Sequence, residues 1–542
     1  MGERSWVDVP VGVRAHQWMT VPAAKRVLVI AHNLTTVTRL MDVLSVFDSD
    51  FRVQVVVSWS GTDPFTLGLD DFMRRLGVVT IPWEQALRTE FDLAIAASHH
   101  GGGLTEINAP VAIMSHGIGY TKYSPGNRKS EIGNRKSVNG QRQTFGLSPQ
   151  WLLYDGQPIA EALVFSHPEQ VARLERDVPE AAHTAVIAGD PCYDRMLASL
   201  GLRRHYRRLL GADDRKVVTV SSTWSDGSLL GSWPELLRSL LAELPIDEYQ
   251  VVAFAHPNAW AAHGPWQIRT WLADCLRAGL VLVPPAEGWR AALIAADVVV
   301  GDHGATTTYA AAIGRPVLLA AFPDDDVVAE SAVGLLGRLA GRLDRRRPLR
   351  AQLDRAVSVP EVRDLVTAVP GESTRLLRAL FYRLMGLSEP PTEPVTARIS
   401  DSGLTARPAP TAVSAHVTLD IPNGQATMVR YPAEIQPAAG THLMVHIGHP
   451  QRTLRANADI LGTDHEDPTD LLAAHPGCAM VATPDGTLTT RDGRHIDVGN
   501  PDYAPVIQAW LDSGEPLPTT ITVNGTPVHP SSSASGNSPS SR

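Results

Sequence analysis

The stretch of sequence that most constrains the fold is residues 297–323, DVVVGDHGATTTYAAAIGRPVLLAAFP. An apolar run typical of a buried strand ends in the small-residue turn 301–305, a helix-forming segment follows, and Gly314 stands where a helix C-cap glycine should. A second apolar run comes after Arg315 and Pro316. This order predicts a strand–turn–helix–strand unit. The free N–H groups at its helix N-terminus favour a phosphate, although a plain crossover without a ligand is the alternative.

Length, charge and cysteine content limit the number of domains, the partners and the compartment that we expect. A chain of 542 residues exceeds one hydrophobic core, so two or more domains are expected. The net charge of −9 argues against nucleic acid as a partner. The three cysteines form no CxxC pair, which fits a reducing compartment. We see neither a secretory signal nor a bilayer-length apolar run and expect a cytoplasmic protein; peripheral contact with the inner membrane face stays open.

Short apolar runs alternate with helical segments through most of the chain, which predicts an α/β fold with parallel sheets covered on both faces. The expected domains are a first Rossmann-like domain at 1–195 and a second, doubly wound like the first, at 196–387. A Pro-, Thr- and Ser-rich linker at 388–412 precedes a small β-rich or α+β domain at 413–529 and a disordered tail at 530–542. The expected strands lie near 27–31, 51–58, 91–97, 111–115, 162–166 and 184–188, then near 217–221, 249–255, 280–283, 298–300 and 317–321.

Candidate site residues of the first domain follow the strand expected at 111–115. His116 stands just past its carboxyl end, the edge where open α/β sheets bind ligands, and is a candidate general base. A histidine that only caps the strand is the alternative. A loop with a local excess of positive charge comes next and includes Lys122, Arg128 and Lys129. It suits a phosphate-rich ligand or an anionic surface, and these three residues are the candidates for acceptor binding; a simple solvated loop is the alternative.

In the second domain, polar residues follow several strands that a parallel sheet would place side by side. Hydroxyls, histidines and a helix N-terminus would then converge and could hold a pyrophosphate, with acidic residues placed to accept hydrogen bonds from ribose. His256 is a candidate catalytic residue together with His116. The candidates for donor binding are Ser222, Thr223, His303, Gly304, Thr306, Thr307, Thr308, Asp324 and Asp325. A purely structural turn at His256 is the alternative.

The order of SHG at 115–117, GDPCYD at 189–194, SSTW at 221–224, AHPN at 255–258 and GDHGATTTYAAAIGRP at 301–316 resembles the GT-B nucleotide-dependent transferases. It is most similar to the CDP-glycerol glycerophosphotransferases of teichoic-acid and capsule synthesis, over roughly residues 25–385. The resemblance implies a cytoplasmic enzyme that moves glycerol phosphate or a sugar from a nucleotide-activated donor to a glycan or polyol-phosphate acceptor. It also implies His116 as the base, His256 on the donor phosphate, and neither a metal nor a cofactor.

The sequence departs from that family in three places. Lys122 falls one position later than the usual lysine, Phe254 and Ala255 stand where an arginine commonly precedes His-Pro, and Asp302-His303-Gly304 is closer to the His-Gly turn of nucleotide-sugar glycosyltransferases. A nucleotide-sugar glycosyltransferase and a non-catalytic nucleotide- or glycan-binding protein therefore stay open. A UDP-N-acetylglucosamine 2-epimerase is a third choice, because 221–226 lacks its His-x-Arg-Glu element.

The last domain matches no family by its motifs. It contains His442, His446 and His449, which we expect to be exposed histidines rather than metal ligands.

Overall fold

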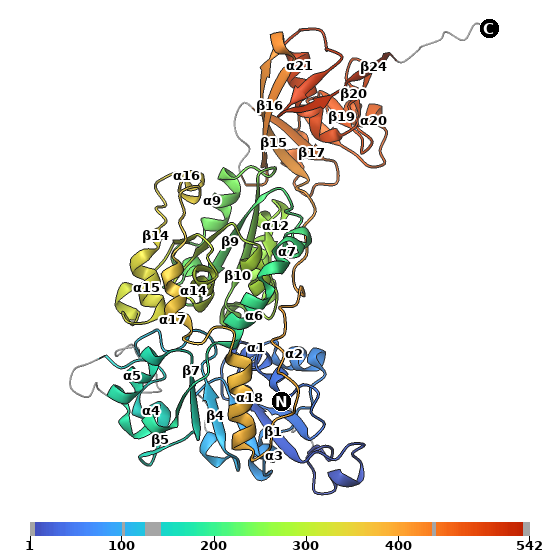
Figure 1. The fold of residues 1–542 in the computed structure, drawn as a ribbon. Helices are drawn as coiled ribbons and strands as arrows, with labels where there is room; N and C mark the ends of the chain where they lie inside the picture. The colour runs from blue at the N-terminus through green and yellow to red at the C-terminus, as the bar shows by residue number, and fades with distance from the viewer. Residues whose placement is uncertain (1–5, 100–102, 125–141, 436–440, 535–542) are drawn as a thin grey trace.

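The chain folds into three domains stacked end to end (Figure 1). The computed structural model describes residues 6–99, 103–124, 142–435 and 441–534. Within these ranges, no helix combines the length and the apolar character needed to cross a membrane.

The first domain is a parallel sheet of six strands in the order β2-β1-β3-β4-β7-β8. Its strands are β1 (Lys25–Ile30), β2 (Val53–Ser58), β3 (Leu93–Ala96), β4 (Val111–Met114), β7 (Ala162–Phe165) and β8 (Ala185–Ile187). Its helices are α1 (Leu34–Met41), α2 (Leu69–Leu76), α3 (Trp83–Arg88), α4 (Pro149–Leu152) and α5 (Pro168–Asp177), and β5 (Leu153–Tyr154) and β6 (Gln157–Pro158) form a separate hairpin.

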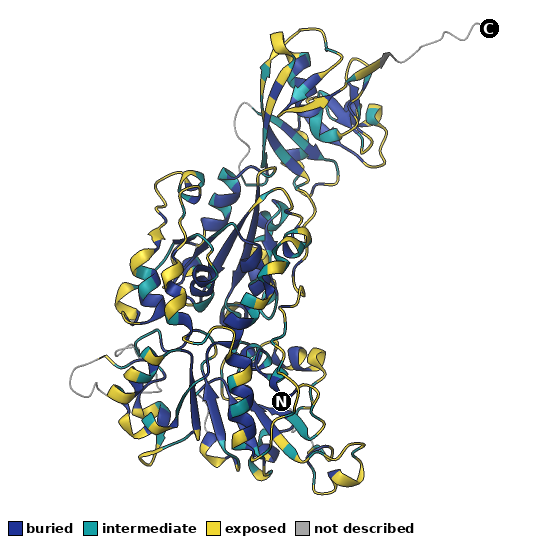
Figure 2. Cartoon of the chain, viewed as in Figure 1, coloured by how far each residue is buried: buried dark blue, intermediate teal, exposed yellow. Residues whose placement is uncertain are grey.

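Strand β1 shows why this sheet is covered on both faces. Val27 and Val29 pack into one apolar cluster, while Leu28 and Ile30 pack into another on the opposite face. Because side chains of a strand alternate between faces, an unbroken apolar run is stable only between two layers of helices. Figure 2 shows the sheets of the first two domains as the most deeply buried elements.

The second domain repeats this architecture with the strand order β11-β10-β9-β12-β13-β14, again parallel throughout. Its strands are β9 (Lys216–Ser222), β10 (Tyr249–Ala255), β11 (Val281–Leu282), β12 (Val298–Gly301), β13 (Val317–Leu319) and β14 (Gly341–Arg342). Its helices are α6 (Pro191–Ser199), α7 (Arg203–Leu209), α8 (Leu229–Ser232), α9 (Leu236–Glu243), α10 (Pro257–His263), α11 (Pro265–Trp271), α12 (Ala273–Arg277), α13 (Trp289–Ala295), α14 (Ala305–Ala312), α15 (Ala332–Leu339), α16 (Leu349–Leu353) and α17 (Arg363–Val366).

The predicted fold class is confirmed: two Rossmann-like domains face each other and a smaller domain follows. The unit expected at 297–323 is present as β12, α14 and β13, and Gly314 has the positive φ of 80° that ends the helix. Each expected strand corresponds to an observed one, whereas β14 was not foreseen because it is only two residues long.

The chain crosses between the first two domains twice, near Gly189 and again through residues 367–372. Helix α18 (Ser373–Leu384) then packs against the first domain, where Leu377 and Phe381 join its core, although the sequence places this helix in the second domain. Asp194 fixes the return crossing by accepting hydrogen bonds from the backbone N–H groups of Gly371 and Ser373, at 2.7 and 2.9 Å.

A buried carboxylate joins the two domains at this hinge. Asp190, fully buried, accepts hydrogen bonds from Arg39 of helix α1 at 2.8 Å and from the hydroxyl of Tyr309 of helix α14 at 2.7 Å. The Arg39 guanidinium and these hydrogen bonds keep the pKa of Asp190 below its usual value, although burial alone would raise it. The contact therefore holds one helix of each domain to the same carboxylate.

The third domain is a ten-stranded mixed sheet in the order β23-β22-β16-β15-β17-β18-β19-β20-β21-β24. Its strands are β15 (Ala412–Asp420), β16 (Gln425–Pro432), β17 (His442–His446), β18 (Ile460–Gly462), β19 (Met480–Ala482), β20 (Thr487–Thr490), β21 (Arg494–Asp497), β22 (Ile521–Val523), β23 (Thr526–Val528) and β24 (Ser531–Ala534), and its helices are α19 (Arg452–Ala456), α20 (Pro468–Ala474) and α21 (Ala504–Asp512). Strand β24 extends into the segment predicted as a disordered tail.

The segment predicted as a linker packs along the first two domains. Ile399 and Leu404 are buried in a core cluster of the second domain, and the hydroxyl of Tyr206 donates to the carbonyl of Ile399 at 2.7 Å. These contacts form because two apolar residues interrupt an otherwise polar segment.

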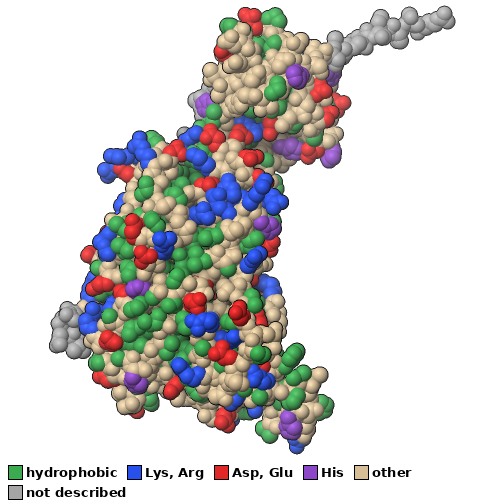
Figure 3. All heavy atoms as spheres, in the orientation of Figure 1, with side chains coloured by type: hydrophobic (Ala, Val, Ile, Leu, Met, Phe, Trp, Pro, Cys, Tyr) green, Lys and Arg blue, Asp and Glu red, His purple; other side chains and the backbone are tan. Residues whose placement is uncertain are grey.

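The third domain docks on the second through charged groups, and acidic and basic side chains gather at this junction (Figure 3). Arg277 donates to both oxygens of Glu434, at 2.7 and 3.0 Å, and His449 contacts the same carboxylate. His449 is only 1% exposed, so the expectation of an exposed histidine was wrong there. The sequence could not show that a carboxylate 15 residues away would bury it.

Replacement of Asp190 by alanine tests the hinge. The substitution leaves the buried Arg39 without its charge partner, and we expect the free energy of unfolding to fall by about 3–5 kcal/mol. Urea unfolding of the full chain measures this change. Asp354→Ala is the matched control: its ion pair with Lys216 is largely exposed, so a loss below about 1 kcal/mol is expected. Equal losses in the two variants would contradict a special role for Asp190.

Candidate functional site

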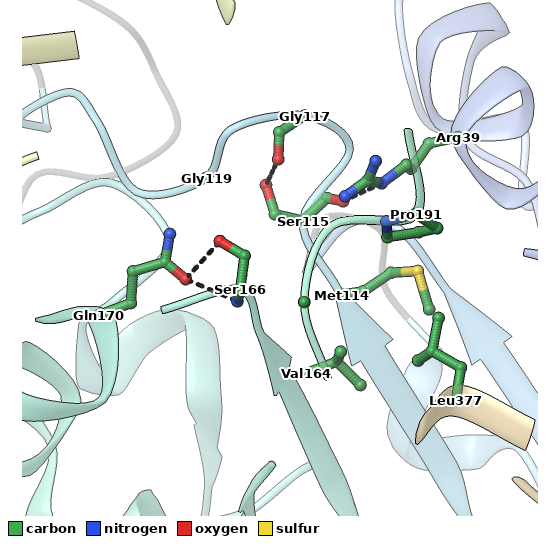
Figure 4. A pocket seen from close by; sticks show the side chains of 11 residues that line it. Arg39, Met114, Ser115, Gly117, Gly119, Val164, Ser166, Gln170, Pro191 and Leu377 are labelled. Atoms are coloured by element: carbon green, nitrogen blue, oxygen red, sulfur yellow. Dashed lines mark hydrogen bonds between the residues drawn. The ribbon is translucent and has the colours of Figure 1, made fainter. Parts of the chain in front are cut away.

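The loop after β4 brings the candidate base to the cleft. Arg39 Nε donates to the carbonyl of Ser115 at 3.1 Å, and Ser115 Oγ donates to the carbonyl of Gly117 at 3.0 Å (Figure 4). A Cβ at Gly119 would lie only 2.4 Å from Ser115 Oγ, so this tight loop requires glycine. The cavity beneath it holds roughly one water molecule. The loop is therefore rigid, and His116 is its exposed side chain.

The same loop reaches the second domain. A Cβ at Gly117 would lie 3.3 Å from the Cβ of Ala305, the first residue of helix α14, so the glycine permits a close approach. His116 is also near enough to His256 for its charge to lower the pKa of His256. The candidate base of one domain thus lies beside both the helix N-terminus and the histidine of the other.

On the second domain, Asp302 organises the turn that begins α14. Its Oδ2 accepts from the N–H groups of Thr223 and Leu229 at 2.7 and 2.9 Å, and its Oδ1 accepts from the N–H of Gly304 at 3.0 Å. Burial raises the pKa of Asp302 to about 6, and these hydrogen bonds oppose the shift. The carboxylate thereby ties the loop after β9 to the turn after β12.

These two strands flank the topological switch point of the sheet. Strand β9 is first in the domain and β12 fourth, yet they are neighbours, and ligands of doubly wound sheets bind in the crevice at such a point. Across the crevice the hydroxyls of Ser221 and Thr306 are 2.6 Å apart. The first N–H groups of α14 have no partner within the helix, which suits an anion.

His256 lies at the next strand end. Its Nδ1 accepts the N–H of Asn258 at 3.1 Å, so the ring caps helix α10 and its proton is assigned to Nε2. Burial lowers the pKa of His256 to about 3, with further contributions from His116 and Lys122. The ring is therefore neutral near pH 7 and can donate a hydrogen bond from Nε2.

His303 is the second neutral histidine. It is 5% exposed, and burial together with the charge of Lys122 lowers its pKa to about 3. Its Nδ1 has no hydrogen-bond partner among the residues that the structure describes. A buried ring nitrogen without a hydrogen bond destabilises the folded protein. A bound ligand that forms a hydrogen bond with Nδ1 would remove this cost.

Lys122 brings a positive charge to these groups. Burial lowers its pKa, whereas Asp302 and Asp326 act in the opposite direction. Its backbone forms a bridge across the cleft: Tyr123 N–H donates to the carbonyl of Asp326 at 3.0 Å, and Val328 N–H donates to that of Thr121 at 2.9 Å. The segment 121–124 thus closes one side of the cleft.

The remaining hydroxyl candidates differ in where their side chains form hydrogen bonds. Thr306 and Gly304 lie at the crevice, but Thr307 Oγ1 accepts the N–H of Asp302 and Thr308 Oγ1 donates to the carbonyl of Gly304, so both hydroxyls are engaged within the turn. Ser222 Oγ is likewise engaged with its own loop, and Thr223 contributes its N–H to Asp302.

The two acidic candidates are exposed. Asp324 pairs with Arg342 at 2.9 Å, and Asp325 is exposed beside it. Arg128 and Lys129 lie outside the described residues.

The organising role of Asp302 was not predicted, although its place directly after a buried strand was a usable signal. Nothing local pointed to Arg39, Asp190 or Tyr309.

The sequence matches no protein-family model and no curated protein. Among solved structures, the wall teichoic acid polymerase TagF superposes with a TM-score of 0.42 and 11% identity over 69% of this chain and 94% of its own. The UDP-GlcNAc 2-epimerase from Methanocaldococcus jannaschii gives 0.40 and 11% over 66% and 99%. A glycosyltransferase from Rickettsia africae gives 0.37 and 10% over 67% and 99%. These likenesses are weak, and the fold assignment rests on the order and direction of the strands.

The neutral state of His303 predicts a pH dependence of stability. Its pKa is about 3 when folded and about 6.5 when unfolded, so the unfolded chain takes up the proton first and stability is lost as the pH falls below 6.5. His303→Gln removes this contribution. The loss of stability between pH 7 and pH 5, measured by urea unfolding, should be about 1–2 kcal/mol smaller in the variant.

His529→Gln, at an exposed histidine, is the control and should lose stability like the unmodified chain. An undiminished acid loss in His303→Gln would show that His303 is not held neutral.

Proposed function

We propose that the protein is a GT-B transferase that moves glycerol phosphate or a sugar from a nucleotide-activated donor to a hydroxyl acceptor. The observation that carries this proposal is the convergence in one cleft of His116 from the first domain with His256, His303 and the start of α14 from the second. The first domain would supply the base for the acceptor, and the second would supply the groups that bind the donor. A site between them would hold the two substrates close together, as a two-substrate reaction needs.

The donor diphosphate would occupy the crevice between β9 and β12. Several groups there favour a negative charge: the first N–H groups of α14, Thr306, the Nε2–H of His256 and the ammonium of Lys122. His303 would bind the same group through its unpartnered nitrogen. Because they are fixed before the ligand binds, these donors can stabilise the charge that develops on the departing nucleotide phosphate.

The proposed reaction uses these positions. His116 takes the proton of the acceptor hydroxyl while the acceptor oxygen attacks the donor, at phosphorus for glycerol phosphate or at the anomeric carbon for a sugar. One bond forms to the acceptor oxygen and the bond from the transferred group to the nucleotide breaks, so the nucleotide leaves with the electron pair. A nucleotide-sugar donor is favoured by the Asp302-His303-Gly304 turn, and a CDP-glycerol donor by the order of the motifs. Synthesis of a cell-envelope or capsule polymer is the proposed setting.

Nucleotide binding to the full chain tests the donor site. CDP, UDP, GDP, TDP and ADP are each added at increasing concentration while the midpoint of thermal unfolding is followed. We expect one nucleotide to raise the midpoint; a ligand at one hundred times its Kd adds about 2.7 kcal/mol of stability. His256→Ala should weaken this nucleotide at least tenfold, because one charge-assisted donor is lost.

His116→Ala is the matched control and should keep the same nucleotide affinity, since the proposal places His116 on the acceptor. Selective stabilisation by CDP supports a glycerol phosphate donor, and stabilisation by another nucleotide supports a sugar donor. Failure of all five nucleotides to bind, or full binding in His256→Ala, would overturn the proposed site.

A further inference from the structure

Two aromatic rings, one from each of the first two domains, meet across the cleft. Phe65 lies on the loop after β2 of the first domain, and Trp224 lies on the loop after β9 of the second. Their ring centroids are 5.2 Å apart in an edge-to-face arrangement with an interplanar angle of 63°. The ring of Trp224 is also 6.5 Å from that of His256. The pair therefore stands beside the groups proposed to carry the reaction.

Both rings are held in place by their loops. Asp63 accepts the N–H of Phe65 at 2.7 Å and the side-chain amide of Asn33 at 2.8 Å, which ties the first loop to the start of α1. On the other side, Thr223 N–H binds Asp302, and Ser225 adopts a φ of 85°, a conformation rare for a residue other than glycine. A loop kept in such a conformation fixes the tryptophan between these two points.

Trp224 is nevertheless 39% exposed, although a ring of its size is normally well covered. An exposed, preorganised aromatic beside a reactive centre suits a ligand with an apolar face and a hydroxylated edge. A pyranose ring has both: its axial C–H groups stack on an aromatic face, and its hydroxyls remain free for hydrogen bonds. On the same loop as Phe65, the hydroxyls of Ser60 and Thr62 hydrogen-bond to each other at 2.8 Å.

An acyclic polyol phosphate has no such face and would instead need cations. Lys122 is a cation of this region: it lies beside Asp302 and Asp326, and its charge acts on His256 and His303, the groups proposed for the donor. Trp224, by contrast, contacts Phe65 of the first domain, the domain that supplies His116. We therefore assign Lys122 to the donor phosphate and the aromatic pair to the acceptor.

We propose that the open face of Trp224, held edge to face by Phe65, stacks on a sugar ring, so that the acceptor hydroxyl belongs to a glycan rather than to a polyol-phosphate chain. In this aromatic clamp Phe65 holds Trp224 and not the sugar itself. This inference rests on the proposed function, because it assigns the second substrate of the same cleft. Trp224 then acts as a determinant of acceptor specificity, and Phe65 completes its site from the other domain.

Saturation-transfer NMR on the full chain tests the clamp. The probes are methyl β-D-glucopyranoside and methyl N-acetyl-β-D-glucosaminide, with glycerol 3-phosphate as the acyclic comparison, each with and without the stabilising nucleotide. In the unmodified chain we expect a saturation-transfer signal for at least one of the two glycosides, which shows that it binds. It should fall at least fivefold in Trp224→Ala and stay within about twofold in Trp224→Phe, which keeps an aromatic face.

Trp266→Ala is the matched control, because Trp266 is 71% exposed on helix α11 and should not affect the signal. Phe65→Ala repeats the test from the first domain should Trp224→Ala fold poorly. The clamp is overturned if neither glycoside binds, if glycoside binding survives in both alanine variants, or if glycerol 3-phosphate binds instead in a Trp224-dependent way.

Nucleotide stabilisation is a separate readout. Glycosides that fail to bind while a nucleotide still stabilises the chain would sink the clamp and leave the transferase proposal standing. Trp224-dependent glycoside binding without any nucleotide effect would support the clamp and contradict the transferase.

Discussion

The buried carboxylate of Asp190 is the constraint on which the cleft depends. It joins Arg39 of helix α1 to Tyr309 of helix α14, and Arg39 also holds the carbonyl of Ser115 next to the candidate base. A buried charge is tolerated only where its partners are fixed. The same group of hydrogen bonds that joins the domains therefore also holds the backbone next to His116.

A second buried carboxylate performs the corresponding task inside the second domain. Asp302 collects three backbone N–H groups and so brings the ends of β9 and β12 together at the switch point. The two histidines beside it are neutral because burial disfavours their charged forms. Neutral rings, a helix N-terminus and one lysine are groups that suit the anionic ligand proposed for this site.

Much of this arrangement could be predicted from local sequence. Apolar runs located the strands, and the rule that ligands bind at carboxyl ends of parallel strands brought His116, His256 and His303 to one cleft. The sequence did not show that the hydroxyls of Thr307 and Thr308 would bond within the turn, whereas that of Thr306 meets Ser221 at the crevice. The candidate linker was read from composition, which does not reveal the docking of Ile399 and Leu404.

The contacts between domains could not be predicted in the same way. Asp190 with Arg39, and Phe65 with Trp224, join residues more than 100 positions apart, and their pairing depends on how the two sheets face each other. No periodicity in one segment carries that information. The roles of these residues follow only from the assembled fold.

A crystal structure of the full chain with the stabilising nucleotide tests the central claim most directly. We predict that the diphosphate lies in the crevice between β9 and β12, within hydrogen-bond distance of Thr306, of the Nε2 of His256 and of Nδ1 of His303. A nucleotide bound in another part of the molecule, with His256 and His303 untouched, would contradict the account.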